Sequence, residues 1–344
     1  MRSIVWPVSG LLFCSGLCAL VFQVAWLREL RLVFGASTPA AAAVLAIFMG
    51  GLGLGNAVLG RRADAVANPL RMYGQLELLI SLASFVSPFL IDLSRMIYIA
   101  LGGQQSLGLT GATIVRLLLA TLVLGLPTFL MGGTLPAAAR TVALARDDGR
   151  RSIGLIYGLN TLGAVMGALL STFVLLEALG TRATLWTACL VNLATGLSAW
   201  WLSSRVVWPV PASPAPHVPP ESMPAPALKR QEKKGRPPRS ASQLPVDSPV
   251  TSSPASSDVL PVQSLDSVLY AAACLVGFAF FLMEIVWYRM LTPILGGTTF
   301  TFGLILAVAL AGIGIGGAMY PWLFGRRRPT LYDLALSCAG EGLA

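Results

Sequence analysis

The residues best suited to chemistry in this chain are polar side chains set inside long apolar stretches. Glu284 lies in one such stretch, and Gln23 holds the corresponding position in a second stretch. Each is followed three residues later by a tryptophan, Trp287 and Trp26, which a helix would place on nearly the same face. Polar groups are costly in a lipid bilayer and must face protein or water. These four residues are therefore candidates for binding a substrate or an ion.

Two interpretations of Glu284 stay open. In the functional interpretation, its carboxylate lines a cavity and attracts a cation or carries a proton. In the structural interpretation, it is protonated or pairs with an arginine such as Arg28 or Arg116, and so holds two halves of the protein together. Arg289 is a poor partner because it lies five residues on, about 140° around a helix.

Other polar residues suggest hydrogen bonding between helices or a gate at one membrane face. Asn160 is more typical of an interhelical hydrogen bond than of a ligand contact, but it remains a candidate ligand. Glu77 lies close to a helix start and is expected to pair with one of three nearby arginines. The candidates for a gate or charge relay are Asp64, Arg61, Arg62, Arg71 and Glu77.

The composition excludes an ordinary soluble domain. The chain is 55% hydrophobic and 11% charged, whereas soluble domains carry roughly 25% charged residues. No catalytic triad or phosphate-binding loop is recognisable, and the five cysteines form no Cys-x-x-Cys pair. We therefore expect no metal, no cofactor and no catalytic residue in this chain. The net charge of +9 sits mainly in loops between apolar runs, so we expect a lipid bilayer and no nucleic acid as the partner.

The elements that position these residues are predicted to be transmembrane helices, because apolar runs of about 20 residues recur along the chain. They fall at 5–27, 38–60, 72–93, 114–138, 153–176, 183–203, 267–288 and 300–324. A ninth begins near Leu331 and is too short to cross the hydrocarbon core, so we expect a truncated helix there.

This pattern divides the chain into three parts. Residues 1–203 form a six-helix transmembrane domain, and residues 265–344 begin a second, truncated repeat. Residues 204–264 are rich in proline, serine and basic side chains, which predicts a disordered linker. Most of the 24 basic residues fall on one side if the N-terminus is cytoplasmic. The N-terminus and the linker are therefore both expected in the cytoplasm.

A sequence repeat at a spacing of 261 residues relates the six-helix domain to the truncated second repeat. Gln23-Val-Ala-Trp26-Leu-Arg28, Gly35 and Gly51 correspond to Glu284-Ile-Val-Trp287-Tyr-Arg289, Gly296 and Gly312. Six helices separate the copies, so both run in the same direction, as in transporters with parallel repeats. Glycines four residues apart predict close helix contacts. These are Gly51 and Gly55, Gly154 and Gly158, Gly163 and Gly167, and Gly312 and Gly316.

The chain resembles two related groups of membrane proteins. The loop Gly60-Arg61-Arg62-Ala63-Asp64, with Arg71 beyond it, is similar to the charge-relay loop of the major facilitator superfamily, although here the basic pair precedes the aspartate. The closer resemblance is to the membrane region of bacterial fused major-facilitator/spermidine-synthase proteins. Its motifs are Leu20-Val-Phe-Gln23, Gly125-Leu-Pro127-Thr-Phe-Leu-Met131-Gly-Gly133-Thr-Leu-Pro136 and Gly154-Leu-Ile-Tyr157-Gly-Leu-Asn160-Thr161-Leu-Gly163-Ala-Val-Met-Gly167.

This resemblance implies an all-α polytopic protein of the bacterial inner membrane, with two parallel major-facilitator-like repeats. It also implies a spermidine-synthase-like domain encoded downstream, so no catalytic role transfers to residues of this chain. We expect a protein that handles a small cationic amine in a cavity between its halves. The alternative is a membrane anchor or scaffold for a cytoplasmic aminopropyltransferase-like domain.

Overall fold

The computed structural model describes residues 4–35, 38–145, 149–206, 262–296, 298–324 and 330–343. Most of the predicted linker lies outside these residues. The chain separates into two units, one formed by Met1–Val210 with Leu275–Ala344 and one formed by Pro211–Cys274. In the second unit the described residues, 262–274, are the first part of one helix.

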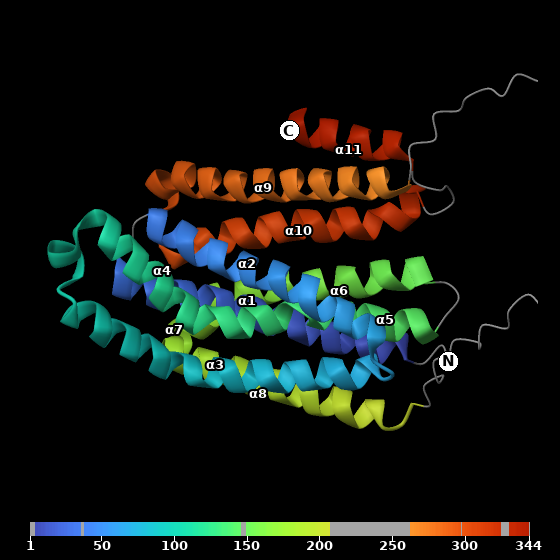
Figure 1. Ribbon diagram of the computed structural model, residues 1–344, viewed down its shortest axis with the longest axis horizontal. Helices are drawn as coiled ribbons and strands as arrows, with labels where there is room; N and C mark the ends of the chain where they lie inside the picture. The colour runs from blue at the N-terminus through green and yellow to red at the C-terminus, as the bar shows by residue number, and fades with distance from the viewer. Residues whose placement is uncertain are drawn as a thin grey trace, which may run out of the picture. The chain divides into compact units, whose positions relative to one another are not determined.

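The described part of the chain is almost entirely helical and contains no strand (Figure 1). The elements before the predicted linker are α1 Val5–Phe34, α2 Thr38–Ala65, α3 Pro69–Ala100, α4 Gly103–Gly132, α5 Thr134–Ala145, α6 Gly149–Leu170, the π-helical segment η1 Ser171–Leu175, α7 Leu176–Ala178 and α8 Gly180–Ser203. The later residues form α9 Val262–Leu295, α10 Thr299–Phe324 and α11 Leu331–Leu343.

Eight helical segments of the described chain are long and apolar enough to cross a membrane. They coincide with the eight complete spans predicted from the sequence, and α4 with α5 counts as one of them. Large apolar side chains are exposed on the outer faces, for example Leu82, Phe89, Leu118 and Leu122. Such faces are stable in lipid and a liability in water. The chain is therefore a multi-pass membrane protein.

Helix α1 is longer than the sequence pattern predicts. It continues past residue 27 to Phe34, so that Arg28 and Arg31 are helical. The helix ends where Gly35 adopts a φ of 94°, a left-handed conformation that glycine reaches without steric cost. Long arginine side chains can extend along a helix toward the membrane surface, which lets the helix continue beyond the apolar run.

The sequence repeat has a matching local structure. Helices α1 and α9 end at Phe34 and Leu295, and helices α2 and α10 begin at Thr38 and Thr299, each pair 261 residues apart. The glycines that end the first helix of each pair both have positive φ, 94° at Gly35 and 81° at Gly296. The two copies therefore share the same helix–turn–helix unit.

Close helix contacts depend on some of the predicted glycines. A Cβ added at Gly163 or Gly167 would lie 2.0 or 2.2 Å from a backbone oxygen of α1, and one at Gly55 would lie 1.9 Å from the oxygen of Phe129 in α4. Gly51 is similarly close to Thr128. Gly158, Gly312 and Gly316 instead have open space beside them in the described structure, so the predicted contacts are absent there.

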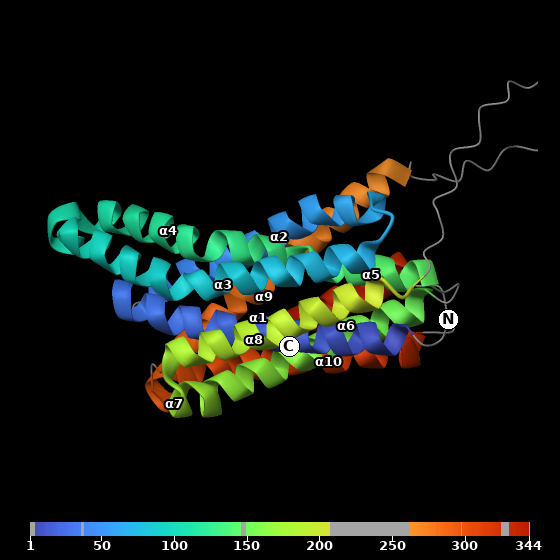
Figure 2. The ribbon, with the colours of Figure 1, turned by 90° about the horizontal axis from the view of Figure 1, so that it is seen from below.

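The helix pairs with the most extensive contacts are α1 with α6, α3 with α8, α2 with α4, and α6 with α10. Helices α3 and α8 run side by side in both views (Figures 1 and 2). Ser81 donates to the carbonyl of Cys189 across this pair. Near the start of α8, Arg182 forms an ion pair with Asp92 of α3.

Candidate functional site

Glu284 and Gln23 are both buried in protein, one of the two environments, protein or water, expected for polar side chains of a membrane span. Their exposed fractions are 1% and 3%. Neither carboxylate oxygen of Glu284 has a hydrogen-bond partner among the described residues, and the same holds for Nε2 of Gln23. A buried carboxylate without a partner is unstable in the charged form. Glu284 must therefore hold a proton or acquire a counter-ion.

The arginines proposed as partners of Glu284 bond elsewhere. Nη1 of Arg28 donates to the carbonyl oxygen of Leu176 at 3.3 Å. Arg116 donates to the hydroxyl of Tyr98 through Nε at 3.0 Å and through Nη2 at 2.7 Å. The described structure therefore does not contain the ion pair of the structural interpretation. A protonated Glu284, the other form of the structural interpretation, is compatible with the described structure.

The two repeat-related tryptophans differ in their surroundings. Trp26 is fully buried, stacks on Phe22 with ring centroids 5.3 Å apart, and donates from Nε1 to Oγ of Ser87 at 2.8 Å. Trp287 is 41% exposed. Trp26 is thus a packing residue between α1 and α3, whereas Trp287 lies on an open face of α9.

Asn160 lies at the crossing of α1 and α6. A Cβ added at Gly16 would lie 2.2 Å from the backbone oxygen of Asn160 and 3.0 Å from its side-chain Oδ1. This close approach favours a role in joining two helices, the interpretation that the sequence already preferred.

Glu77 faces α1 and α8 instead of the arginines with which it was expected to pair. It is fully buried, and the side chains of Ser15, Tyr73 and Asn192 lie next to its carboxyl group. None has hydrogen-bonding geometry to the carboxylate oxygens. The amide of Asn192 donates instead to the backbone oxygen of Glu77 at 2.8 Å. The predicted ion pair is therefore wrong for the described chain, because Glu77 points into the helix bundle.

The other gate candidates lie on the surface. Asp64, Arg61, Arg62 and Arg71 are all exposed. The guanidinium of Arg71 lies over the ring of Trp200, 5.8 Å from its centroid, and its backbone N–H caps α3 by donating to Asn68. In the described structure these residues form no hydrogen bond or ion pair with Glu77, so the predicted relay is not assembled.

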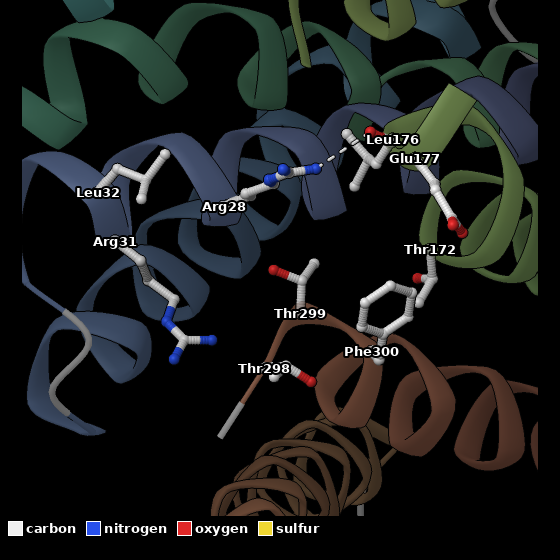
Figure 3. Close-up of a pocket in the computed structure, with 9 residues that line it drawn as sticks. All are labelled: Arg28, Arg31, Leu32, Thr172, Leu176, Glu177, Thr298, Thr299 and Phe300. Carbon is white, nitrogen blue, oxygen red and sulfur yellow. Dashed lines mark hydrogen bonds between the residues drawn. The ribbon is translucent and has the colours of Figure 1, made fainter. Parts of the chain in front are cut away.

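A pocket of about 550 Å³ lies where α1, η1–α7 and the start of α10 meet (Figure 3). None of the predicted binding or gate residues lines it, although Arg28, predicted as a possible partner of Glu284, does. Its walls carry two guanidinium groups, one carboxylate and three threonine hydroxyls. The lining residues are Arg28, Arg31, Leu32, Thr172, Leu176, Glu177, Thr298, Thr299 and Phe300.

The sequence contained only part of the signal for this pocket. Arg28 stands at the end of an apolar run, and Arg31 lies three residues on, so one helix face could have been anticipated to carry both. The π-helical turn that places Thr172 has no recognisable sequence signature. Such turns occur often at functional sites in helical proteins.

Comparisons with known proteins give no further guide to the site. The chain matches no protein-family model, no curated protein and no solved structure. The groups of the described chain that could do chemistry are two buried carboxylates, a buried amide and a basic pocket.

Proposed function

We propose that this chain is the membrane portion of a transport protein built from two parallel major-facilitator-like repeats. It lies in a bacterial inner membrane, with the N-terminus and the linker in the cytoplasm. Its resemblance to fused spermidine-synthase proteins suggests that the transported solute is a small cationic amine. Glu284 is the residue that takes up the amine or a coupled proton.

The observation that carries this proposal is the state of Glu284. It is buried in a segment apolar enough to span a membrane, and both carboxylate oxygens lack a hydrogen bond within the described chain. Placing an ionisable group there costs about 3 kcal/mol or more unless it is solvated, paired or neutralised. The equivalent position in the first repeat holds Gln23, so an amide suffices for folding. A carboxylate at this position is better explained by binding than by packing.

A membrane anchor for an aminopropyltransferase-like domain is the second candidate. One observation favours it: Gln23 and Trp26 are buried and Asn160 packs against Gly16 of α1, and none of the three lines the pocket described above. An anchor needs stable helices and has no need of a solute pathway.

The test compares Glu284→Gln with the unchanged protein in proteoliposomes, using labelled spermidine or putrescine. Glutamine keeps the size of the side chain and removes its ionisable group. We expect the Glu284→Gln protein to fold like the unchanged protein, as measured by gel filtration and thermal unfolding. Its amine uptake should fall to the level of empty liposomes. Glu29→Gln is the control, because Glu29 is a glutamate of α1 that lies beyond the predicted apolar run of residues 5–27.

Three results would count against the proposal. Full uptake by a stable Glu284→Gln protein would remove the assigned role of this residue. Loss of folded protein would make Glu284 a structural residue. The absence of amine uptake by the unchanged protein would favour the anchor.

A further inference from the structure

We infer that the pocket between α1, η1–α7 and α10 is a binding site for a singly charged oxyanion group. The group is a carboxylate or phosphate carried by a small solute or by a lipid headgroup. This inference goes beyond the proposed function and does not depend on Glu284, which does not line the pocket.

The charges of the pocket set the sign of the ligand. Arg28 and Arg31 each contribute a guanidinium group, and Glu177 contributes one carboxylate, which leaves a net charge of +1. Figure 3 shows both guanidinium groups reaching from α1 toward the space enclosed by α7 and α10. Arg28 uses one N–H for the carbonyl of Leu176, and a guanidinium has five N–H donors. It therefore keeps donors for an oxyanion, which guanidinium groups bind strongly.

The start of α10 adds donors on the facing wall. Thr298, Thr299 and Phe300 line the pocket, and α10 begins at Thr299. The first backbone N–H groups of a helix have no partner within the helix, and the helix dipole favours a negative charge beside them. The hydroxyls of Thr298 and Thr299 are further potential donors to the same group.

Thr172 supplies an independent indication that a ligand belongs here. Its side chain lines the pocket, is 2% exposed, and has a hydroxyl without a hydrogen-bond partner in the described structure. An unsatisfied buried hydroxyl costs about 1 to 3 kcal/mol. The π-helical turn of η1 is what places this residue at the pocket. The hydroxyl packs against Gly303 of α10, so it would have to rotate about its Cα–Cβ bond to donate to a ligand oxygen in the pocket.

Two probes separate the sources of such a group. Line broadening of the ³¹P signal of inorganic phosphate, at constant ionic strength in detergent, reports a free solute. Native mass spectrometry of protein released from nanodiscs containing phosphatidylglycerol reports a retained lipid headgroup. Broadening alone indicates a solute site, and adducts alone indicate a headgroup site.

The variants are Arg28→Gln and Thr172→Val. Arg28→Gln should weaken the positive signal about tenfold or more, because a charge-assisted donor is lost. Thr172→Val keeps the shape packed against Gly303 and removes only the hydroxyl. It should weaken binding without lowering thermal stability, which keeps the test valid if Arg28→Gln fails to fold.

Arg95→Gln is the control, since Arg95 is an exposed arginine of α3 outside the pocket. It should leave both signals unchanged. The inference is overturned if neither probe binds. It is also overturned if a probe binds equally well to Thr172→Val and to the unchanged protein.

Discussion

Single residues at repeat-related positions have diverged in role. Trp26 and Trp287 follow Gln23 and Glu284 at the same spacing, yet Trp26 is buried between helices and Trp287 is 41% exposed. Burial follows from the neighbours of each helix: α1 packs against α6 and α8, whereas the apolar window of α9 is only 6% buried. The same residue type is therefore expected to contribute differently to the free energy of unfolding in the two repeats.

This difference predicts unequal effects of the same substitution. Trp26→Phe removes the indole N–H that bonds Ser87 and leaves a small void beside Phe22. It should lower the free energy of unfolding by about 1 to 3 kcal/mol. Trp287→Phe should change it by less than about 0.5 kcal/mol. Thermal or detergent unfolding of purified protein measures both, and equal losses would contradict the packing described for Trp26.

The surroundings of the candidate site residues could be predicted from the sequence only in part. It was predictable that Glu284 and Gln23 face protein or water, because each is a polar residue in an apolar run and is costly in lipid. The inward direction of Glu77 was not predictable. Its spacing from Arg71 along the chain does not show that Asn192 of α8 lies next to its carboxyl group. Thr172 was also missed, because its position depends on a π-helical turn.

At the scale of helices, glycine spacing predicted close contacts only in part. Gly163 and Gly167 meet α1, whereas Gly158, in the same helix, has no atom of the described structure within 4 Å of an added Cβ. Spacing identifies a smooth helix stripe, but only the arrangement of neighbours decides whether another helix lies on it. The helix ends were more predictable, since Gly35 and Gly296 stop α1 and α9 at equivalent positions.

The contact of α1 with α6 can be tested with a matched pair of glycines. Gly163→Ala would place a methyl group 2.0 Å from the oxygen of Phe13, so the helices must separate. The expected cost is about 1 to 3 kcal/mol of folding stability. Gly158→Ala should be neutral or slightly stabilising, because alanine favours the helix. Similar melting temperatures for both variants would show that α1 and α6 do not approach this closely.

At the scale of the molecule, the helical class and the eight spans of the described residues followed from composition and run length alone. Those properties depend on the contrast between lipid and water, which every residue of a span samples. The pocket followed from neither, because it is formed by three elements distant in sequence. The parallel direction of the repeats is a proposal that rests on the 261-residue spacing and the matching helix–turn–helix units.

The most direct test of this account is the side of the membrane reached by the ends of α1 and α9. Reporter fusions truncated after Gly35 and after Gly296, positions 261 residues apart, can be assayed with alkaline phosphatase and with green fluorescent protein. Parallel repeats with a cytoplasmic N-terminus predict an external reporter at both positions, and a cytoplasmic reporter after Ser242 in the linker. Opposite sides for Gly35 and Gly296 would contradict the parallel repeats, and with them the proposed transport architecture.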